Sequence, residues 1–336
     1  MGLHDSQVNK AERRYGQGED TLGQSPRRIA AGSIRLMNKR LIWNRLSLDI
    51  PTPWETIVKG PRHLIFEHGL APVLEIRWQP PAKPGKVSER VQRKHTETII
   101  RQCNIPASSS RAQTADHRLP AAVLEQFDTT VFDAQPGSPA SLLLVCKACS
   151  TTILAALHRA TPAWFATHAS VFESLCCRHD DAAFTPWQIQ DFFFAVPAGF
   201  ELDSCSFTFG ISDLLFRSRR ADLRICRLAP ASEHLKRSSL PALFAAFCSA
   251  APESVEIVDE QTLGYHSAPS LVEQLWKRAC RKRPFIQASF NHFVEYDRIL
   301  GSLLAANQVP PPEFTTPIAN GYGIIQEKTA AADPHP

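Results

Sequence analysis

The chain has 336 residues, of which 43% are apolar and 21% are charged, and its formal net charge is +4. This composition is typical of a globular protein, and the length allows two domains that each bury a core. No apolar run reaches the roughly 18 residues that a transmembrane helix needs. The polar N-terminal segment lacks the apolar core of a signal peptide, so we expect a cytoplasmic protein.

Residues 1–40 are rich in Gly, Gln, Ser and Arg and show little apolar periodicity, which predicts a disordered basic arm. Such an arm can neutralise phosphates, so a nucleic-acid-associated protein is one alternative function. A second basic cluster at 276–283 places Trp276 beside five charges, an arrangement that suits a single strand. Because the net charge is small, solvated basic side chains are the preferred interpretation of both segments.

The first predicted domain covers residues 41–180. Apolar and polar residues alternate at 46–50, which indicates a half-buried strand that Pro51 ends. A helix is expected at 86–103 and another at about 166–177. The strands of this domain are expected, in chain order, at 46–50, 64–66, 74–78, 120–132 and 141–157.

The second half of the chain repeats the first. Residues 194–201, FAVPAGFE, match residues 48–55, LDIPTPWE, with Pro, an aromatic residue and Glu at the same places. Further matches follow in the same order: Gly60 with Gly210, Leu64–Phe66 with Leu214–Phe216, His117 with His266, Pro120 with Pro269, and 123–126 with 271–274. We therefore expect a second copy of the domain at 181–308, followed by a Pro-rich, weakly ordered tail at 309–336.

The order of the elements predicts the fold class. In the second copy a helix is expected at 231–249, with strands before it and at 270–280 and 285–304 after it. Strands and helices are segregated in each copy rather than alternating. This favours an α+β fold of two tandem repeats, each an antiparallel sheet with one or two packed helices, over a doubly wound parallel sheet.

LDIPTPWE and FAVPAGFE each combine a short strand, a Pro and an aromatic residue before a strand meander. This opening resembles that of the Mog1/PsbP-like fold, once in each copy. The resemblance implies two tandem domains with curved sheets, an architecture seen in small binding and assembly proteins. It implies no catalytic residues for this chain.

The nine cysteines, with no signal-peptide core, indicate reduced thiols rather than a disulfide framework. Cys146 and Cys149 have the C-x-x-C spacing with which two thiolates bind Zn²⁺. A structural zinc site has four ligands, and Cys176 and Cys177 could supply the other two. A metal-binding or redox protein that uses these four cysteines is therefore one alternative function. The apolar flanks of the motif predict a strand, and adjacent cysteines rarely reach one ion together. Ordinary strand cysteines and no cofactor are thus preferred, with Zn²⁺ as the alternative.

Four further residues are candidates for binding because they match between the copies: Trp54, Phe200, His117 and His266. A core role for the aromatic residues and a turn role for the histidines are the simpler interpretations. No nucleophile elbow, phosphate loop or dinucleotide fingerprint occurs. The sequence therefore favours a non-catalytic binding or assembly module with an unknown protein partner. An enzyme stays open, because active-site residues can lie far apart in sequence.

Overall fold

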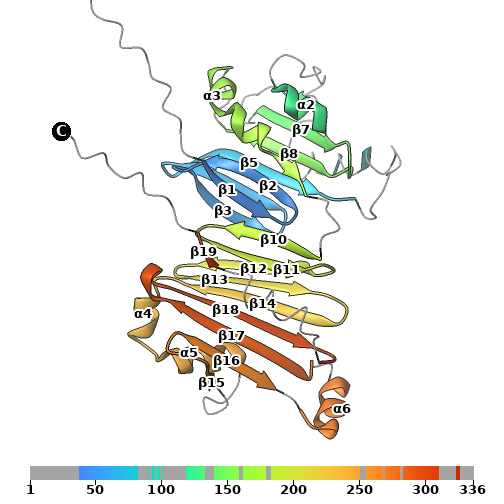
Figure 1. Cartoon of the computed structure of the whole chain (residues 1–336). Coiled ribbons are helices and arrows are strands. Elements are labelled where there is room, and N and C mark those ends of the chain that lie inside the picture. The colour runs from blue at the N-terminus through green and yellow to red at the C-terminus, as the bar shows by residue number, and fades with distance from the viewer. Residues whose placement is uncertain are drawn as a thin grey trace, which may run out of the picture. The chain divides into compact units, whose positions relative to one another are not determined.

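The computed structural model describes residues 38–81, 119–132, 140–158, 162–178, 183–249, 255–267, 269–280, 283–309 and 323–325, with isolated residues between 90 and 101. They belong to one compact unit and form three antiparallel sheets (Figure 1). Strands make up 54% of these residues and helices 20%. The expected α+β class is therefore wrong, because the helices are too few and too short to form layers that match the sheets.

The N-terminal sheet has the strand order β3-β4-β5-β8-β7-β6. Its strands are β3 (Glu55–Gly60), β4 (His63–His68), β5 (Ala71–Gln79), β6 (Phe127–Phe132), β7 (Ala140–Cys146) and β8 (Thr152–Leu157). Every residue of β7 and β8 is buried, as expected for apolar strands covered on both faces. The accompanying helices α2 (Ala121–Gln126) and α3 (Pro162–Glu173) contact each other.

The C-terminal sheet has the order β12-β13-β14-β18-β17-β16-β15. Its elements are β12 (Glu201–Thr208), β13 (Ile211–Arg217), β14 (Ala221–Leu228), α4 (Ala231–Leu235), α5 (Leu240–Cys248), β15 (Glu256–Ile257), β16 (Thr262–Ser267), α6 (Leu271–Ala279), β17 (Phe285–Phe293), the 3₁₀ turn η2 (Val294–Tyr296) and β18 (Arg298–Ala306). In both sheets a three-strand meander pairs with the strand that comes last in that sheet along the chain, β8 or β18. The duplication itself stays a prediction.

The third sheet, here the hairpin sheet, has the order β19-β11-β10-β1-β2-β9. Its strands are β1 (Asn38–Trp43), β2 (Leu46–Pro51), β9 (Cys176–Cys177), β10 (Phe184–Ile189), β11 (Phe192–Pro197) and β19 (Gly323–Ile324). The opening hairpin of each half therefore leaves its own sheet, and β1 pairs with β10. The expectation of one sheet per repeat is wrong because the alternating pattern predicts a strand but not its partner.

One apolar core contains residues of all three sheets. At its centre the buried ring of Trp43 meets Trp187 edge-on, with ring centroids 5.1 Å apart, and lies 5.9 Å from Phe207. Such aromatic contacts stabilise a fold beyond the area that they bury. A second cluster packs α5 on the C-terminal sheet, where Phe244 and Phe247 both contact Phe290.

Several expected boundaries change. The strand predicted at 120–132 is correct only for its second part, because α2 follows Pro120 and β6 begins at Phe127. The strand predicted at 270–280 is wrong, because α6 occupies Leu271–Ala279. A short apolar run does not distinguish a strand from a helix, which explains both errors. The helix predicted at 231–249 is confirmed, although it is divided into α4 and α5.

The chain termini were expected to carry little structure. Of the predicted basic arm, residues 1–37 lie outside the described part, and residues 38–40 belong to β1. Of the predicted tail, residue 309 and residues 323–325 are described, and Gly323–Ile324 form β19. No described helix has the length and apolar character needed to cross a bilayer.

Candidate metal centre

The C-x-x-C motif lies in the turn between β7 and β8. Cys146 is the last residue of β7, and its carbonyl accepts a hydrogen bond of 2.8 Å from the backbone N–H of Ser150. The backbone N–H of Cys146 donates to the carbonyl of Thr151 at 2.9 Å, which closes the turn. Ser150 has a φ of 58°, in the left-handed region that tight turns use. This compact turn holds Cys146 and Cys149 close together.

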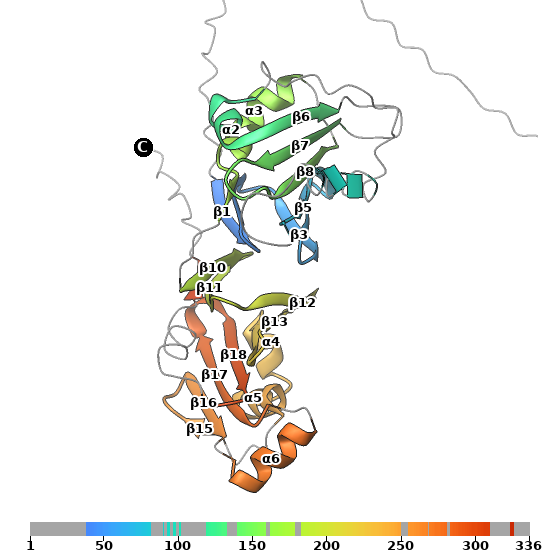
Figure 2. The ribbon, with the colours of Figure 1, turned by 90° about the vertical axis from the view of Figure 1, so that its right-hand side faces the viewer.

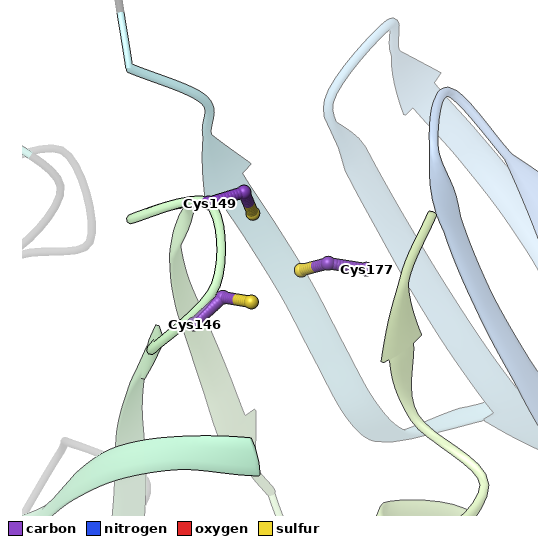
Figure 3. Close-up of side chains that lie close together, drawn as sticks. All are labelled: Cys146, Cys149 and Cys177. Atoms are coloured by element: carbon purple, nitrogen blue, oxygen red, sulfur yellow. The ribbon is translucent and has the colours of Figure 1, made fainter. Parts of the chain in front are cut away.

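Cys177 reaches the motif from the hairpin sheet. It lies in β9, which pairs with β2 so that Cys177 is opposite Leu46. Its thiol points toward Cys146 and Cys149, and the three Sγ atoms all lie within 4.8 Å of one another (Figure 3). The structure thus brings together three of the four cysteines that the sequence singles out.

Cys176 does not join the cluster. Successive side chains of a strand point to opposite faces, so β9 can direct only one of its two cysteines toward the motif. The thiol of Cys176 instead lies 3.5 Å from the carbonyl oxygen of Cys177. The objection that adjacent cysteines rarely reach one ion is met, because only one of the pair is needed here.

The three thiols influence one another's ionisation. Hydrogen bonds from Cys146 and Cys177, with a further contact of 3.1 Å to the Thr151 hydroxyl, lower the pKa of Cys149 far below its ordinary value. Hydrogen bonds with Cys146 and Cys149 raise the pKa of Cys177, and the hydrogen bond with Cys149 raises the pKa of Cys146. Within the cluster, these hydrogen bonds favour ionisation of Cys149 over ionisation of Cys146 or Cys177.

A pocket of about 810 Å³ adjoins this cluster. Cys146 and Cys177 line it, so two of the three thiols border a path by which an ion could enter. Charged residues of both signs form much of its remaining wall: Arg40, Asp49, Glu125, Lys147, Glu173 and Arg178. Among the described residues, no fourth Cys, His, Asp or Glu joins the group of three donors.

The other predicted binding residues lie elsewhere. Trp54 is a core residue, only 3% exposed, and its ring stacks on His168 at 5.2 Å. Phe200 is partly buried against the same core. His266 is exposed on β16, and His117 lies outside the described residues. The described members of this set therefore form no common surface around Trp54, whose side chain belongs to the interior.

A polar cluster that sequence reasoning missed lies on the N-terminal sheet. Glu75 of β5 accepts hydrogen bonds from His63 at 2.9 Å and from Arg77 at 2.7 Å, and His158 lies 3.5 Å from it. The hydrogen bond of His63 and the hydrogen bond and charge of Arg77 outweigh burial and lower the pKa of Glu75 to about 2. The alternation of apolar and charged residues at 74–78 was the available signal in the sequence. It places Glu75 and Arg77 on the same face of one strand.

This carboxylate predicts a pH dependence of stability. The pKa of Glu75 falls from 4.5 to about 2 on folding, so its stabilisation is fully present above pH 4.5 and is lost as the pH falls toward 2. We expect Glu75→Gln to lower the free energy of unfolding by up to about 3 kcal/mol at neutral pH, and by little near pH 2. Urea unfolding between pH 2 and 7 measures this difference. Glu201→Gln, at an exposed position of β12, is the control, and a penalty that is equal at all pH values would contradict the prediction.

Comparison with known proteins assigns no family to this chain: no protein-family model matches the sequence, and no curated protein matches it. The Mog1/PsbP-like resemblance therefore stays a prediction. The functional argument rests on the three thiols and their surroundings.

Proposed function

We propose that the protein binds a thiophilic metal ion, Zn²⁺ in the first instance, through Cys146, Cys149 and Cys177. The observation that carries the proposal is the convergence of three Sγ atoms within 4.8 Å, from two different sheets. Zn–S bonds of about 2.3 Å in tetrahedral geometry place sulfur atoms roughly 3.8 Å apart. The three sulfur atoms thus need to move by only about 1 Å to bind an ion.

The chemistry of the donors supports a soft or borderline ion. Thiolates select Zn²⁺ or Cu(I) over Mg²⁺ and Ca²⁺, which prefer oxygen donors. Cys149 is the first ligand in this proposal because its thiol already ionises most readily. Binding of an ion would release the protons of Cys146 and Cys177. The positive charge of the ion would then compensate the negative charges of the three thiolates.

The proposed ion has a structural role. Cys146 and Cys149 belong to the β7–β8 turn of the N-terminal sheet, and Cys177 belongs to β9 of the hairpin sheet. A shared ion would therefore tie an edge strand of only two residues, β9, to a well-packed turn. Three protein donors would leave the fourth position of a tetrahedral ion open, as in catalytic zinc sites, so this structural role does not by itself exclude an enzyme.

Metal analysis of the untagged full-length protein, purified under reducing conditions, tests the proposal. We expect about one zinc ion per chain by elemental analysis and native mass spectrometry, and protection of three of the nine thiols from alkylation when zinc is present. Metal-free protein that takes up no zinc at micromolar concentration would overturn the proposal. A metal-free mass that lacks two hydrogens would overturn it as well, since it would indicate a disulfide and hence a redox pair.

A further inference from the structure

The helix α6 presents its apolar face to solvent. Leu271 and Val272 are each 77% exposed, Leu275 is 67% exposed and Trp276 is 71% exposed. At 3.6 residues per turn these side chains and Ala279 fill one continuous arc of about 140°. The half-buried side chains of the helix are polar ones, Gln274 and Lys277. A surface helix ordinarily has the opposite arrangement, so this apolar face calls for a partner.

The matched helix in the first half shows the difference. Val123-Leu124-Glu125-Gln126 of α2 corresponds in sequence to the first four residues of α6. Val123 is only 1% exposed, and Leu124 packs against the core. The same motif thus packs against the body of the molecule in α2 and stays open in α6. The helix α6 lies at the lower end of the molecule in both views (Figures 1 and 2), and Figure 1 shows it well apart from α4 and α5.

Local hydrogen bonds define the start of α6 without help from its apolar face. The hydroxyl of Ser270 accepts from the backbone N–H of Glu273 at 3.4 Å, and the Glu273 carboxylate accepts from the backbone N–H of Ser270 at 2.9 Å. This reciprocal pair is a capping box, which stabilises a helix N-terminus by itself. The start of α6 is therefore stabilised without burial of its apolar face.

Charge identifies the kind of partner. The helix contains a single acidic residue, Glu273, whereas five basic residues accompany Trp276: Lys277, Arg278, Arg281, Lys282 and Arg283. Of these, Arg283 is bound to Asp222 at 3.2 Å. Contact between the α6 helices of two copies would bring two such basic sequences near each other. A lipid surface with negative headgroups offers both an apolar layer and complementary charge.

We propose that α6 is an interfacial helix that binds the surface of an anionic phospholipid bilayer. Leu271, Leu275 and Trp276 enter the acyl boundary, and the positive charge of the sequence around α6 favours negatively charged headgroups. A short helix with one tryptophan binds weakly by itself, so attachment depends on apolar burial and charge together. This inference goes beyond metal binding and does not depend on it.

Vesicle cosedimentation of the full-length protein tests the proposal. We expect binding to vesicles of phosphatidylcholine with 30% phosphatidylserine, and at least tenfold weaker binding to phosphatidylcholine alone. The double variant Leu275→Ser/Trp276→Ser should bind the anionic vesicles at least tenfold more weakly than the unmodified protein. Phe209→Ser is the matched control because this aromatic residue is 98% exposed on the β12–β13 turn, away from α6.

The double variant changes only exposed side chains, so its thermal unfolding should match that of the unmodified protein, which separates lost binding from lost folding. Equal vesicle binding by the double variant and the unmodified protein would overturn the proposal, since the N-terminal basic residues would then suffice. Failure of the unmodified protein to bind anionic vesicles would overturn it too. A change in oligomeric mass caused by the double variant would point instead to a protein partner on this face.

Discussion

Replacing Cys177 by serine is expected to lower the affinity of the protein for Zn²⁺ by about 100-fold or more. Four thiolate or imidazole ligands together supply roughly 10–16 kcal/mol in small zinc domains, or about 3 kcal/mol per ligand. Cys177 is also the only described donor from the hairpin sheet in the cluster, so its loss removes the link between two sheets. Competition with a chromophoric zinc chelator measures the affinity directly.

Cys176→Ser provides a closely matched control. It makes the same chemical change one residue away, in the same strand, on the side chain that does not join the cluster. We expect its zinc affinity to stay within about twofold of that of the unmodified protein. Zinc should also raise the unfolding temperature of Cys176→Ser but not of Cys177→Ser, because an ion that binds only the folded state stabilises it. Equal losses of affinity in both variants would contradict the assignment of Cys177.

The second large effect is expected for stability. Trp43→Ala should lower the free energy of unfolding by about 3–5 kcal/mol, because it removes a fully buried ring from the centre of the core. The ring of Trp43 contacts Trp187 and Phe207, which belong to the other half of the chain. Chemical unfolding followed by far-ultraviolet circular dichroism measures the loss.

Trp43→Phe separates the role of the ring from that of the indole N–H. The Nε1 atom of Trp43 is buried and has no hydrogen-bond partner among the described residues, so its removal relieves an unfavourable burial. Phenylalanine keeps most of the aromatic volume, and we expect it to cost less than about 1.5 kcal/mol. A loss as large as that of the alanine variant would show that size alone does not explain the role of Trp43.

The sequence predicted many elements but not their partners. Alternating residues at 46–50 predicted β2 because the period of a strand is visible locally. The pairing of β1 with β10 was missed, since backbone hydrogen bonds between distant segments leave no mark on residue types. The error in fold class has a different origin, because the helices are too few and too short to form layers that match the sheets.

The candidate site was predictable in part. The C-x-x-C spacing directed attention to Cys146 and Cys149, and the adjacent Cys176 and Cys177 were natural further candidates. The choice between those two depends on which face of β9 meets the β7–β8 turn, and no sequence pattern contains that information. The cluster around Glu75 was missed because its members come from three strands or their ends, far apart along the chain.

The composition of the hairpin sheet has a consequence for synthesis on the ribosome. The N-terminal sheet has all its strands once residue 157 has emerged, whereas β1 has a free edge until β10, at Phe184–Ile189, becomes available. The last strand of the hairpin sheet, β19, comes from Gly323–Ile324. An unpaired edge on a nascent chain can pair with a neighbouring chain on the same message. We therefore expect chaperones that cover unpaired strands to act on this protein while residues 43–184 are being synthesised.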